Sequence, residues 1–299
     1  MPAAPPILLL DAFSLLYRAF FALPPLTTRA GEPTSALYGL SLLLLKLLRE
    51  QKPRGGAFAI DLPRPTFRHE LWDGYKASRQ RAPSPLGQQV GRLGEIIAAF
   101  GFPAVSSPGF EADDVLATLA TELAAGGDAP MVVSGDRDSL QLAHGGTRVL
   151  YVGRGVKEKC YDAKEVEARF GVPPASLPDY VALVGDPSDD LPGVAGVGQK
   201  TAARLVTTLG GVDGILARLP EVKPARAHDA ILAEGDRLRL WRDLARLRTD
   251  VPLVAAPRWS KVTPEAREHV RHLFEKLEFV SLAARVDEAF GPALGDGGA

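Results

Sequence analysis

Apolar positions in the first half of the chain gather in short runs, and patterns of helical spacing lie between them. The runs typical of buried strands are 7–10, 57–60, 103–105 and 131–134. The helical patterns are 35–50, 86–100 and 112–125. Strands that alternate with helices predict an α/β unit with a mostly parallel central sheet and helices on both faces. A later pair, 148–152 and 156–161, is separated by Gly153 and Gly155 and predicts a hairpin or edge element.

The second half of the chain changes to helical patterns separated by glycine and proline. The predicted helices are 163–170, 177–184, 198–209, 225–233, 236–246 and 264–277. Asp162 is a suitable N-cap for the first of them. We therefore expect an α/β core at 1–171, a helical region at 172–290 and a flexible, glycine-rich tail at 291–299.

Composition fits an ordered globular protein. With 299 residues and 46% hydrophobic content, the chain can bury a substantial core as one large domain or as a larger and a smaller one. Its apolar runs are too short for a signal peptide or a membrane span, so we expect a cytoplasmic protein with no membrane partner. The single Cys160 excludes an internal disulfide and a multi-cysteine zinc site. No coiled-coil heptad run appears, and we expect a monomer.

The overall charge does not identify a partner, but its distribution is uneven. The formal net charge is −1, from 35 basic and 36 acidic residues. The stretch from 74 to 94 contains no acidic residue, while its basic residues are Lys76, Arg79, Arg81 and Arg92. Such a segment could bind phosphate, or it could be an ordinary solvated loop, which is the commoner case.

Acidic residues follow three of the predicted strands. Asp11 follows the first run, Asp61 follows the second, and Asp136 and Asp138 follow the run that ends at Ser134. The carboxyl ends of parallel strands meet at one edge of a sheet, where ligands bind. We therefore expect these acids to converge. One such acid usually caps the next helix, but three in the same topology are harder to explain in that way.

Two further acidic groups occur later in the chain. Glu111, Asp113 and Asp114 open a predicted helix, where acids are also common because the helix end is positive. The tight turn after Gly185 contains Asp186, Asp189 and Asp190, and acidic turns are ordinary surface features.

Carboxylates that are packed together repel one another unless a cation neutralises them or one takes up a proton. These carboxylates offer only oxygen atoms as metal ligands, which favours hard ions such as Mg²⁺ or Mn²⁺. Many carboxylates over one cleft can hold two ions, the arrangement used in phosphodiester hydrolysis. The acids therefore predict a metal site, and the basic segment predicts a ligand that contains phosphate.

A glycine-rich turn leads into the helix predicted from 198. Its glycines are Gly193, Gly196 and Gly198, and Lys200 and Thr201 follow. Glycines before a helix N-terminus let backbone N–H groups approach a phosphate. The spacing does not match a nucleotide P-loop, and a plain turn between helices is the competing interpretation.

Six segments occur in one order from Ile7 to about Val286. They are LLLDAFSLLYRAFFALPPLTTRAGEPTSALYG, AIDLPRPTFRHELWDGYKASR, GFEADDVLATLA, VVSGDRDSLQL, LVGDPSDDLPGVAGVGQKTAARLV and FEKLEFVSL. Together they strongly resemble the 5′ nuclease family. This family includes the N-terminal domain of bacterial DNA polymerase I, stand-alone bacterial and phage 5′-3′ exonucleases and, more distantly, flap endonucleases. The resemblance implies a PIN-like core and a helical subdomain that contains a helix-three-turn-helix at about 183–209.

The resemblance also implies roles for individual residues. The first metal would be surrounded by Asp11, Asp61, Glu111, Asp113 and Asp136, with Asp114 beside them. The second metal would be associated with Asp138, Asp186 and Asp189. The catalytic residues would be Tyr75, Lys76 and Arg79 at the base of a helical arch at about 73–95, together with Arg18. The DNA contacts would be Phe67, Arg68, Arg81, Gly193, Gly196, Gly198, Lys200 and Thr201.

From the resemblance we expect a 5′-3′ exonuclease and flap endonuclease of replication and repair, located at the nucleoid. Its partners would be DNA with 5′ ends, flaps or nicks, and RNA primers are a further candidate. A metal-activated water would attack the phosphorus while Lys76 stabilises the developing charge. A K⁺ ion is expected at the helix-three-turn-helix. The chain stops where a polymerase would continue, which favours a stand-alone enzyme, although an excised domain would look the same.

The sequence departs from the family pattern at two places. Asp190 replaces the usual Asn, and we expect it to alter metal use by adding charge beside the second metal. The arch segment after Arg81 lacks the usual acids and is rich in Pro and Gly, so we expect it to be basic and mobile without DNA.

Two other functions remain open at this point. A phosphatase of the haloacid dehalogenase type would use the Asp136-Arg137-Asp138 cluster alone, and it would leave Asp11 and Asp61 unexplained. A non-catalytic, structure-specific DNA-binding protein would keep the DNA-binding surface without turnover.

Overall fold

A seven-stranded sheet forms the centre of the computed structural model, which describes residues 5–63, 65–153, 155, 157–253 and 258–291. Its strands are β1 (Ile7–Asp11), β2 (Gly55–Ala59), β3 (Ala104–Val105), β4 (Pro130–Ser134), β5 (Arg148–Val152), β6 (Glu158–Tyr161) and β7 (Ser260–Lys261). The order is β3-β2-β1-β4-β5-β6, and β7 pairs with β2. Only β6 and β7 run antiparallel to their neighbours, so the prediction of a mostly parallel sheet is confirmed.

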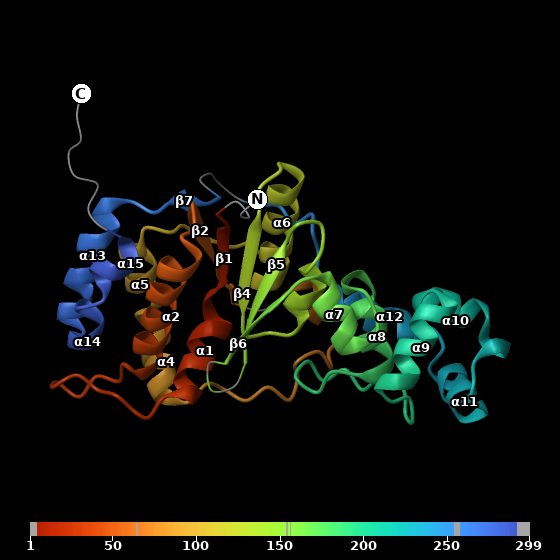
Figure 1. Cartoon of the computed structure of the whole chain (residues 1–299). Coiled ribbons are helices and arrows are strands. Elements are labelled where there is room, and N and C mark those ends of the chain that lie inside the picture. Colours follow the sequence, from red (N-terminus) through yellow and green to blue (C-terminus); the bar gives the residue numbers. More distant parts are fainter. Residues whose placement is uncertain (1–4, 64, 154, 156, 254–257, 292–299) are drawn as a thin grey trace.

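Helices cover both faces of this sheet (Figure 1). Leu8 and Leu10 of β1 belong to the apolar cluster with α2 (Ser35–Gln51), whereas Ile7 and Leu9 belong to the cluster with α6 (Ala112–Ala125). Side chains alternate between the two faces of a strand. A strand that is buried on both faces therefore reads as a continuous apolar run, as β1 does.

The predicted helix at 86–100 is two helices. They are α4 (Ser84–Gly91) and α5 (Leu93–Phe100), and Arg92 separates them. Gly91 and Gly94 flank the break, and glycine has low helix propensity. Five helices of the described chain were absent from the sequence expectation: α1 (Ala12–Ala22), the short α3 (Phe67–Leu71), α10 (Gly211–Ala217), α14 (Val280–Ala283) and α15 (Val286–Phe290).

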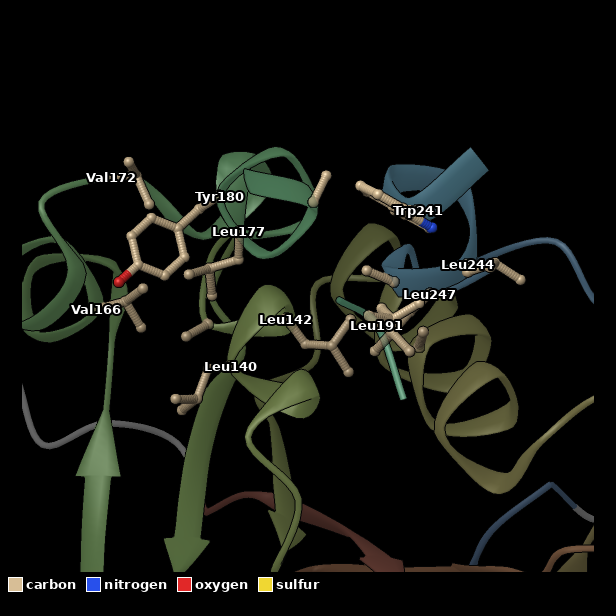
Figure 2. Packing of buried hydrophobic residues seen from close by; sticks show 14 of the residues in the cluster. Leu140, Leu142, Val166, Val172, Leu177, Tyr180, Leu191, Trp241, Leu244 and Leu247 are labelled. Atoms are coloured by element: carbon tan, nitrogen blue, oxygen red, sulfur yellow. The ribbon is translucent and has the colours of Figure 1, made fainter. Parts of the chain in front are cut away.

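A helical region extends from one end of the sheet (Figure 1). It comprises α7 (Ala163–Phe170), α8 (Leu177–Val184), α9 (Gln199–Leu209), α10 (Gly211–Ala217), α11 (Ala225–Glu234) and α12 (Arg237–Ala245), with single 3₁₀ turns at Pro174–Ser176 and Leu219–Glu221. Figure 2 shows the apolar side chains that join it to the core. Leu140 and Leu142, from the 3₁₀ turn Asp138–Leu142, belong to one apolar cluster with Leu177 of α8 and Leu244 of α12.

The last described helices return to the α/β core, so the predicted helical region 172–290 divides in two. They are α13 (Pro264–Lys276), α14 (Val280–Ala283) and α15 (Val286–Phe290). Phe274 is fully buried, and its ring lies 6.5 Å from that of Phe100 in α5. The predicted tail at 291–299 lies outside the described residues apart from Gly291. None of the helices in the described part of the chain is long and apolar enough to cross a membrane.

Candidate active site

Three acids lie at the carboxyl ends of adjacent parallel strands, as predicted. Asp11 is the last residue of β1, Asp61 follows β2, and Asp136 follows β4. Strand β1 lies between the other two, so the three acids share one edge of the sheet. The Asp11 carboxylate accepts hydrogen bonds from Ser14 N (3.1 Å) and Ser134 Oγ (2.7 Å). The two serines fix its orientation, and the sequence reasoning missed both.

The start of α6 brings further acids to the same edge. Glu111 is the N-cap residue of α6, and Asp113 lies in the first turn. The Asp61 carboxylate accepts a hydrogen bond from Ala112 N at 2.8 Å, which joins the end of β2 to this helix start. Free N–H groups at a helix N-terminus favour nearby carboxylates.

The turn after α8 also reaches this edge. Tyr75, which is 1% exposed, donates its hydroxyl at 2.9 Å to Glu111 and at 2.9 Å to Asp189. Asp186 lies in the same turn, where its carboxylate accepts from Ser188 N at 2.7 Å. Carboxylates from the core and from the helical region therefore meet around one buried tyrosine.

Lys76 supplies a buried positive charge among these acids. Its Nζ lies 3.1 Å from Glu111 and 3.6 Å from Asp189, and the residue is 6% exposed. Burial opposes the charged form of Lys76, but the two carboxylates raise its pKa overall. Burial likewise opposes the charge on Glu111, yet Lys76 and Arg68 lower the pKa of this carboxyl overall. The ammonium and the Glu111 carboxylate therefore stabilise each other's charge.

The remaining acids carry an excess of negative charge. Burial raises the pKa of Asp11 to about 6, although hydrogen bonds from Ser14 and Ser134 lower it in part. Burial, followed by repulsion from Asp11 and Asp136, raises the pKa of Asp113 well above its usual value. Burial and repulsion from Asp136 do the same to the pKa of Asp138.

A divalent cation suits this donor set. The Oδ1 atom of Asp113 is buried and, in the described part of the molecule, accepts no hydrogen bond. All the donors are carboxylate oxygens, which hard cations prefer. In residues 5–63, 65–153, 155, 157–253 and 258–291, no three Asp, Glu, His or Cys side chains already form a set that could hold an ion. The acids therefore surround a common region without converging on one point.

Two residues expected at the site have other partners. Asp114, expected beside the first metal, is fully buried and accepts two hydrogen bonds from Arg68. Arg68, expected to contact DNA, is 1% exposed, and its guanidinium also donates to Leu244 O and Arg246 O. Both expectations are corrected, because the pair is enclosed between α3, α6 and the segment after α12.

Arg18 and Phe67 flank the site. The guanidinium of Arg18 donates to Gly135 O at 3.1 and 2.6 Å, and so holds the loop that carries Asp136. The ring of Phe67 lies 5.6 Å from that of Phe110 and beneath the Arg68 guanidinium, at 4.5 Å. Arg79 and Arg81 are exposed beyond the Lys76 turn. Their expected roles in catalysis and DNA contact stay predictions.

The second half of the predicted arch is anchored in the core. Leu86 and Gln89 of α4 are buried, and Gln89 Oε1 accepts hydrogen bonds from Ala36 N (2.7 Å) and Leu37 N (3.3 Å). Gln89 therefore caps the N-terminus of α2. This part of the segment packs as a helix on α1 and α2, contrary to the mobility expected of it.

The glycine-rich turn joins α8 to α9 as expected for a helix-three-turn-helix. Gly193 has a φ of +66°, and a Cβ there would lie 2.4 Å from Gly185 N, so only glycine fits. Gly198 is the N-cap residue of α9, and a Cβ there would meet open space. Lys200 is exposed in the first turn of this helix, and Thr201 is half-buried.

Asp190 faces away from the acids that precede it in the turn. Its carboxylate accepts hydrogen bonds from Ser78 N (2.9 Å) and Ser78 Oγ (2.6 Å), and these bonds lower its pKa. The Asp190 carboxylate therefore contacts the arch segment. This contact corrects the expectation that its charge acts on a second metal. No sequence pattern links two residues so far apart.

Comparisons with known proteins agree over most of the chain. The family model for the 5′-3′ exonuclease N-terminal resolvase-like domain matches residues 6–171, and the model for the 5′-3′ exonuclease C-terminal SAM fold matches 172–268. DNA polymerase I of Mycobacterium bovis is 40% identical over 98% of this chain, and the thermostable DNA polymerase I of Thermus thermophilus is 39% identical over 92%. The matches span 33% and 32% of those polymerases, about a third of their length.

Solved structures agree on the fold. A T5 5′-exonuclease with bound divalent metal ions (zinc) has a TM-score of 0.67 and 18% identity, and the match covers 95% of this chain and 99% of that one. A bacteriophage T5 flap endonuclease in a pseudo-enzyme-product complex with DNA and metal ions has a TM-score of 0.66 and 17% identity, with the same coverage.

Proposed function

The chain belongs to the 5′-3′ exonuclease family, and on that premise we propose that it is a metal-dependent 5′-3′ exonuclease and structure-specific 5′ flap endonuclease of DNA replication and repair. One observation carries the proposal: a buried lysine lies among a group of carboxylates at the switch point of a parallel sheet, where ligands of such sheets bind.

The carboxylates divide into two groups that would hold separate ions. We assign to the first ion Asp11, Asp61, Glu111, Asp113 and Asp136. We assign to the second ion Asp138, Asp186 and Asp189. Bound Mg²⁺ or Mn²⁺ supplies Lewis acidity that activates water and neutralises charge on a phosphate. The T5 5′-exonuclease named above holds divalent ions, which supports a metal on this fold.

The chain's own residues orient and stabilise the phosphate. Lys76 is the group we assign to the charge that develops on the scissile phosphate, since its ammonium is held in place by Glu111 and Asp189 before DNA binds. Tyr75 positions the same two carboxylates. Arg79 and Arg81 would contact the strand near the cut as exposed cations.

The turn from Gly193 to Thr201 is the second contact that we assign to DNA. Its exposed helix start and Lys200 suit a phosphate, and backbone carbonyls of the turn would hold a K⁺ ion. Contacts to phosphates carry no base information, so selectivity should follow strand ends, flaps and nicks. We extend the proposal to RNA primers as substrates and to a monomeric, nucleoid-associated protein.

Cleavage of a panel of labelled substrates tests the proposal. A 5′-labelled flap, a nicked duplex, a blunt duplex and a circular single strand are incubated with Mg²⁺, Mn²⁺ or EDTA. We expect metal-dependent products from the flap and the nick, none from the circle, and loss of products in Asp138→Ala. Asp229→Ala, at an exposed acid of α11 that belongs to neither proposed metal group, should behave as wild type. Binding without products from any substrate would instead identify a non-catalytic DNA-binding protein.

A further inference from the structure

The base of the arch segment is fastened to the turn that carries Asp189. Both carboxylate oxygens of Asp190 accept hydrogen bonds from Ser78, at 2.9 Å from its backbone N and 2.6 Å from its Oγ. One residue earlier in that turn, Asp189 O accepts a hydrogen bond from Lys76 N at 3.2 Å. Three hydrogen bonds therefore join residues 76–78 to residues 189–190 across more than a hundred positions of sequence.

Both sides of this junction have an uncommon backbone conformation. Lys76 has a φ of +51° and Asp190 a φ of +61°, which place them in the left-handed region. Asp and Asn tolerate that region, whereas a lysine rarely adopts it. A strained residue keeps such a conformation only where its surroundings enforce it. The hydrogen bonds from the turn supply that enforcement for Lys76.

The conformation of Lys76 decides where its ammonium lies. Its side chain reaches Glu111 and Asp189 in the interior, while Ser78, two residues later, is exposed and contacts Asp190. A loosened segment would let the lysine relax towards an ordinary conformation and withdraw its ammonium from the acids. The left-handed turn is thus the connection between an exposed carboxylate and a buried catalytic cation.

We propose that Asp190 is a positioning residue for the cleavage reaction: by holding Ser78, it keeps Lys76 in place at the scissile phosphate. This inference rests on the proposed function. It replaces the expectation that Asp190 acts on a second metal, because both of its oxygens already accept hydrogen bonds from Ser78.

Three substitutions isolate the contact. Asp190→Gly removes the carboxylate and keeps the left-handed backbone, which glycine adopts freely. Asp190→Asn keeps the backbone and an oxygen acceptor but removes the charge. Ser78→Ala removes the hydroxyl from the opposite side. Ser78 is exposed and Asp190 is half-buried, so we expect all three variants to fold.

Steady-state cleavage of a 5′ flap, at varied flap and Mg²⁺ concentrations, separates positioning from metal and DNA binding. We expect Asp190→Gly to lower kcat about 10- to 100-fold, the scale of a misplaced catalytic group. KM for the flap and the Mg²⁺ concentration for half-maximal rate should stay within about twofold of wild type. Asp190→Asn should recover most of the rate, and Asp190→Gly combined with Ser78→Ala should be no slower than Asp190→Gly alone, because residues in one contact are not additive.

A second measurement needs neither metal nor DNA. Amide hydrogen exchange in EDTA should be faster at Lys76 and Ser78 in Asp190→Gly than in wild type, and unchanged in α2. A shift in the Mg²⁺ requirement, an unchanged kcat, additive losses or unchanged exchange would each overturn the inference while wild type still cleaves the flap. If wild type cleaves no substrate, the proposed function fails, and the positioning role fails with it.

Discussion

Arg68 and Asp114 form a buried, two-pronged ion pair. The Arg68 Nη1 atom lies 2.6 Å from Asp114 Oδ2, and Nη2 lies 2.8 Å from Oδ1. Two further N–H groups of Arg68 reach Leu244 O at 2.7 Å and Arg246 O at 2.9 Å. The pair therefore ties the start of α6, which carries Glu111, to the end of α12 in the helical region.

Removing the Arg68 charge should destabilise the whole fold. Arg68→Met leaves Asp114 charged and unpaired in the interior, which costs about 3–5 kcal/mol of unfolding free energy. Urea unfolding followed by circular dichroism measures this loss. Arg248→Met is the matched control, because its guanidinium pairs with Asp250 at the surface and is 47% exposed. We expect the control to lose at most about 1 kcal/mol. Equal stability of the two variants, with weaker DNA binding by Arg68→Met, would restore the DNA-contact interpretation.

Gln89 offers a similar comparison within one helix. Gln89→Met deprives two buried N–H groups of α2 of their acceptor, so we expect a loss of about 1–3 kcal/mol. The neighbouring Gln88 is exposed, and Gln88→Met should change the unfolding free energy by less than about 0.5 kcal/mol. Chemical denaturation distinguishes them. If both variants unfold at the same denaturant concentration, Gln89 does not anchor the arch segment.

The sequence could predict the acids but not these anchors. Asp11, Asp61 and Asp136 were predictable because each follows an apolar run, and the ends of parallel strands meet by topology. Arg68 and Gln89 look like surface residues in sequence, since polar groups are seldom fully buried. Their partners come from distant elements, and no local pattern encodes such a pairing. The return of α13 to α5 was missed for the same reason.

Metal-free protein should lose stability as the acids ionise. Folding raises the pKa of Asp11 from 3.8 to about 6, and burial also raises the pKa of Asp113 well above its usual value. A raised pKa means that the folded state binds protons more tightly than the unfolded state. The stabilisation that these protons provide is fully present below pH about 4 and is lost as the pH rises through the folded pKa. In EDTA, Asp113→Asn should therefore gain unfolding temperature relative to wild type as the pH rises above about 4. Asp229→Asn, at an exposed site, should show no such trend.

The buried carboxyls also predict how Mg²⁺ changes the unfolding temperature. Protons and metal ions compete for the carboxylates, so added Mg²⁺ should raise the unfolding temperature of wild type more at pH about 8 than at pH about 5. Differential scanning fluorimetry provides both series. An Mg²⁺ effect that is equal at the two pH values, or equal in Asp113→Asn, would contradict a site built on these acids.

Lys76 should act on the chemical step. Lys76→Met removes the ammonium next to Glu111 and Asp189, and we expect kcat for flap cleavage to fall about 10²- to 10³-fold. KM should change little, because the lysine is buried and is not part of the outer surface. Lys200→Met, at an exposed lysine of α9, should instead raise KM and leave kcat nearly unchanged. A Lys76 variant that loses only affinity would place this residue among the binding groups.

Two glycines of one turn should separate folding from DNA binding. Gly193→Ala forces a Cβ to within 2.4 Å of Gly185 N at a φ of +66°, so the turn must rearrange, and both stability and DNA affinity should fall. Gly198→Ala places its methyl group in open space at a φ of −86°, so its unfolding should stay close to that of wild type. If a phosphate approaches the exposed start of α9, that methyl group stands in its way, and the Kd for a nicked duplex should rise several-fold.

Fluorescence anisotropy in EDTA at one fixed salt concentration measures binding without cleavage, and fixed salt is needed because phosphate contacts depend on it. Unchanged affinity in Gly198→Ala would remove the start of α9 from the DNA interface and leave Lys200 as an isolated surface charge.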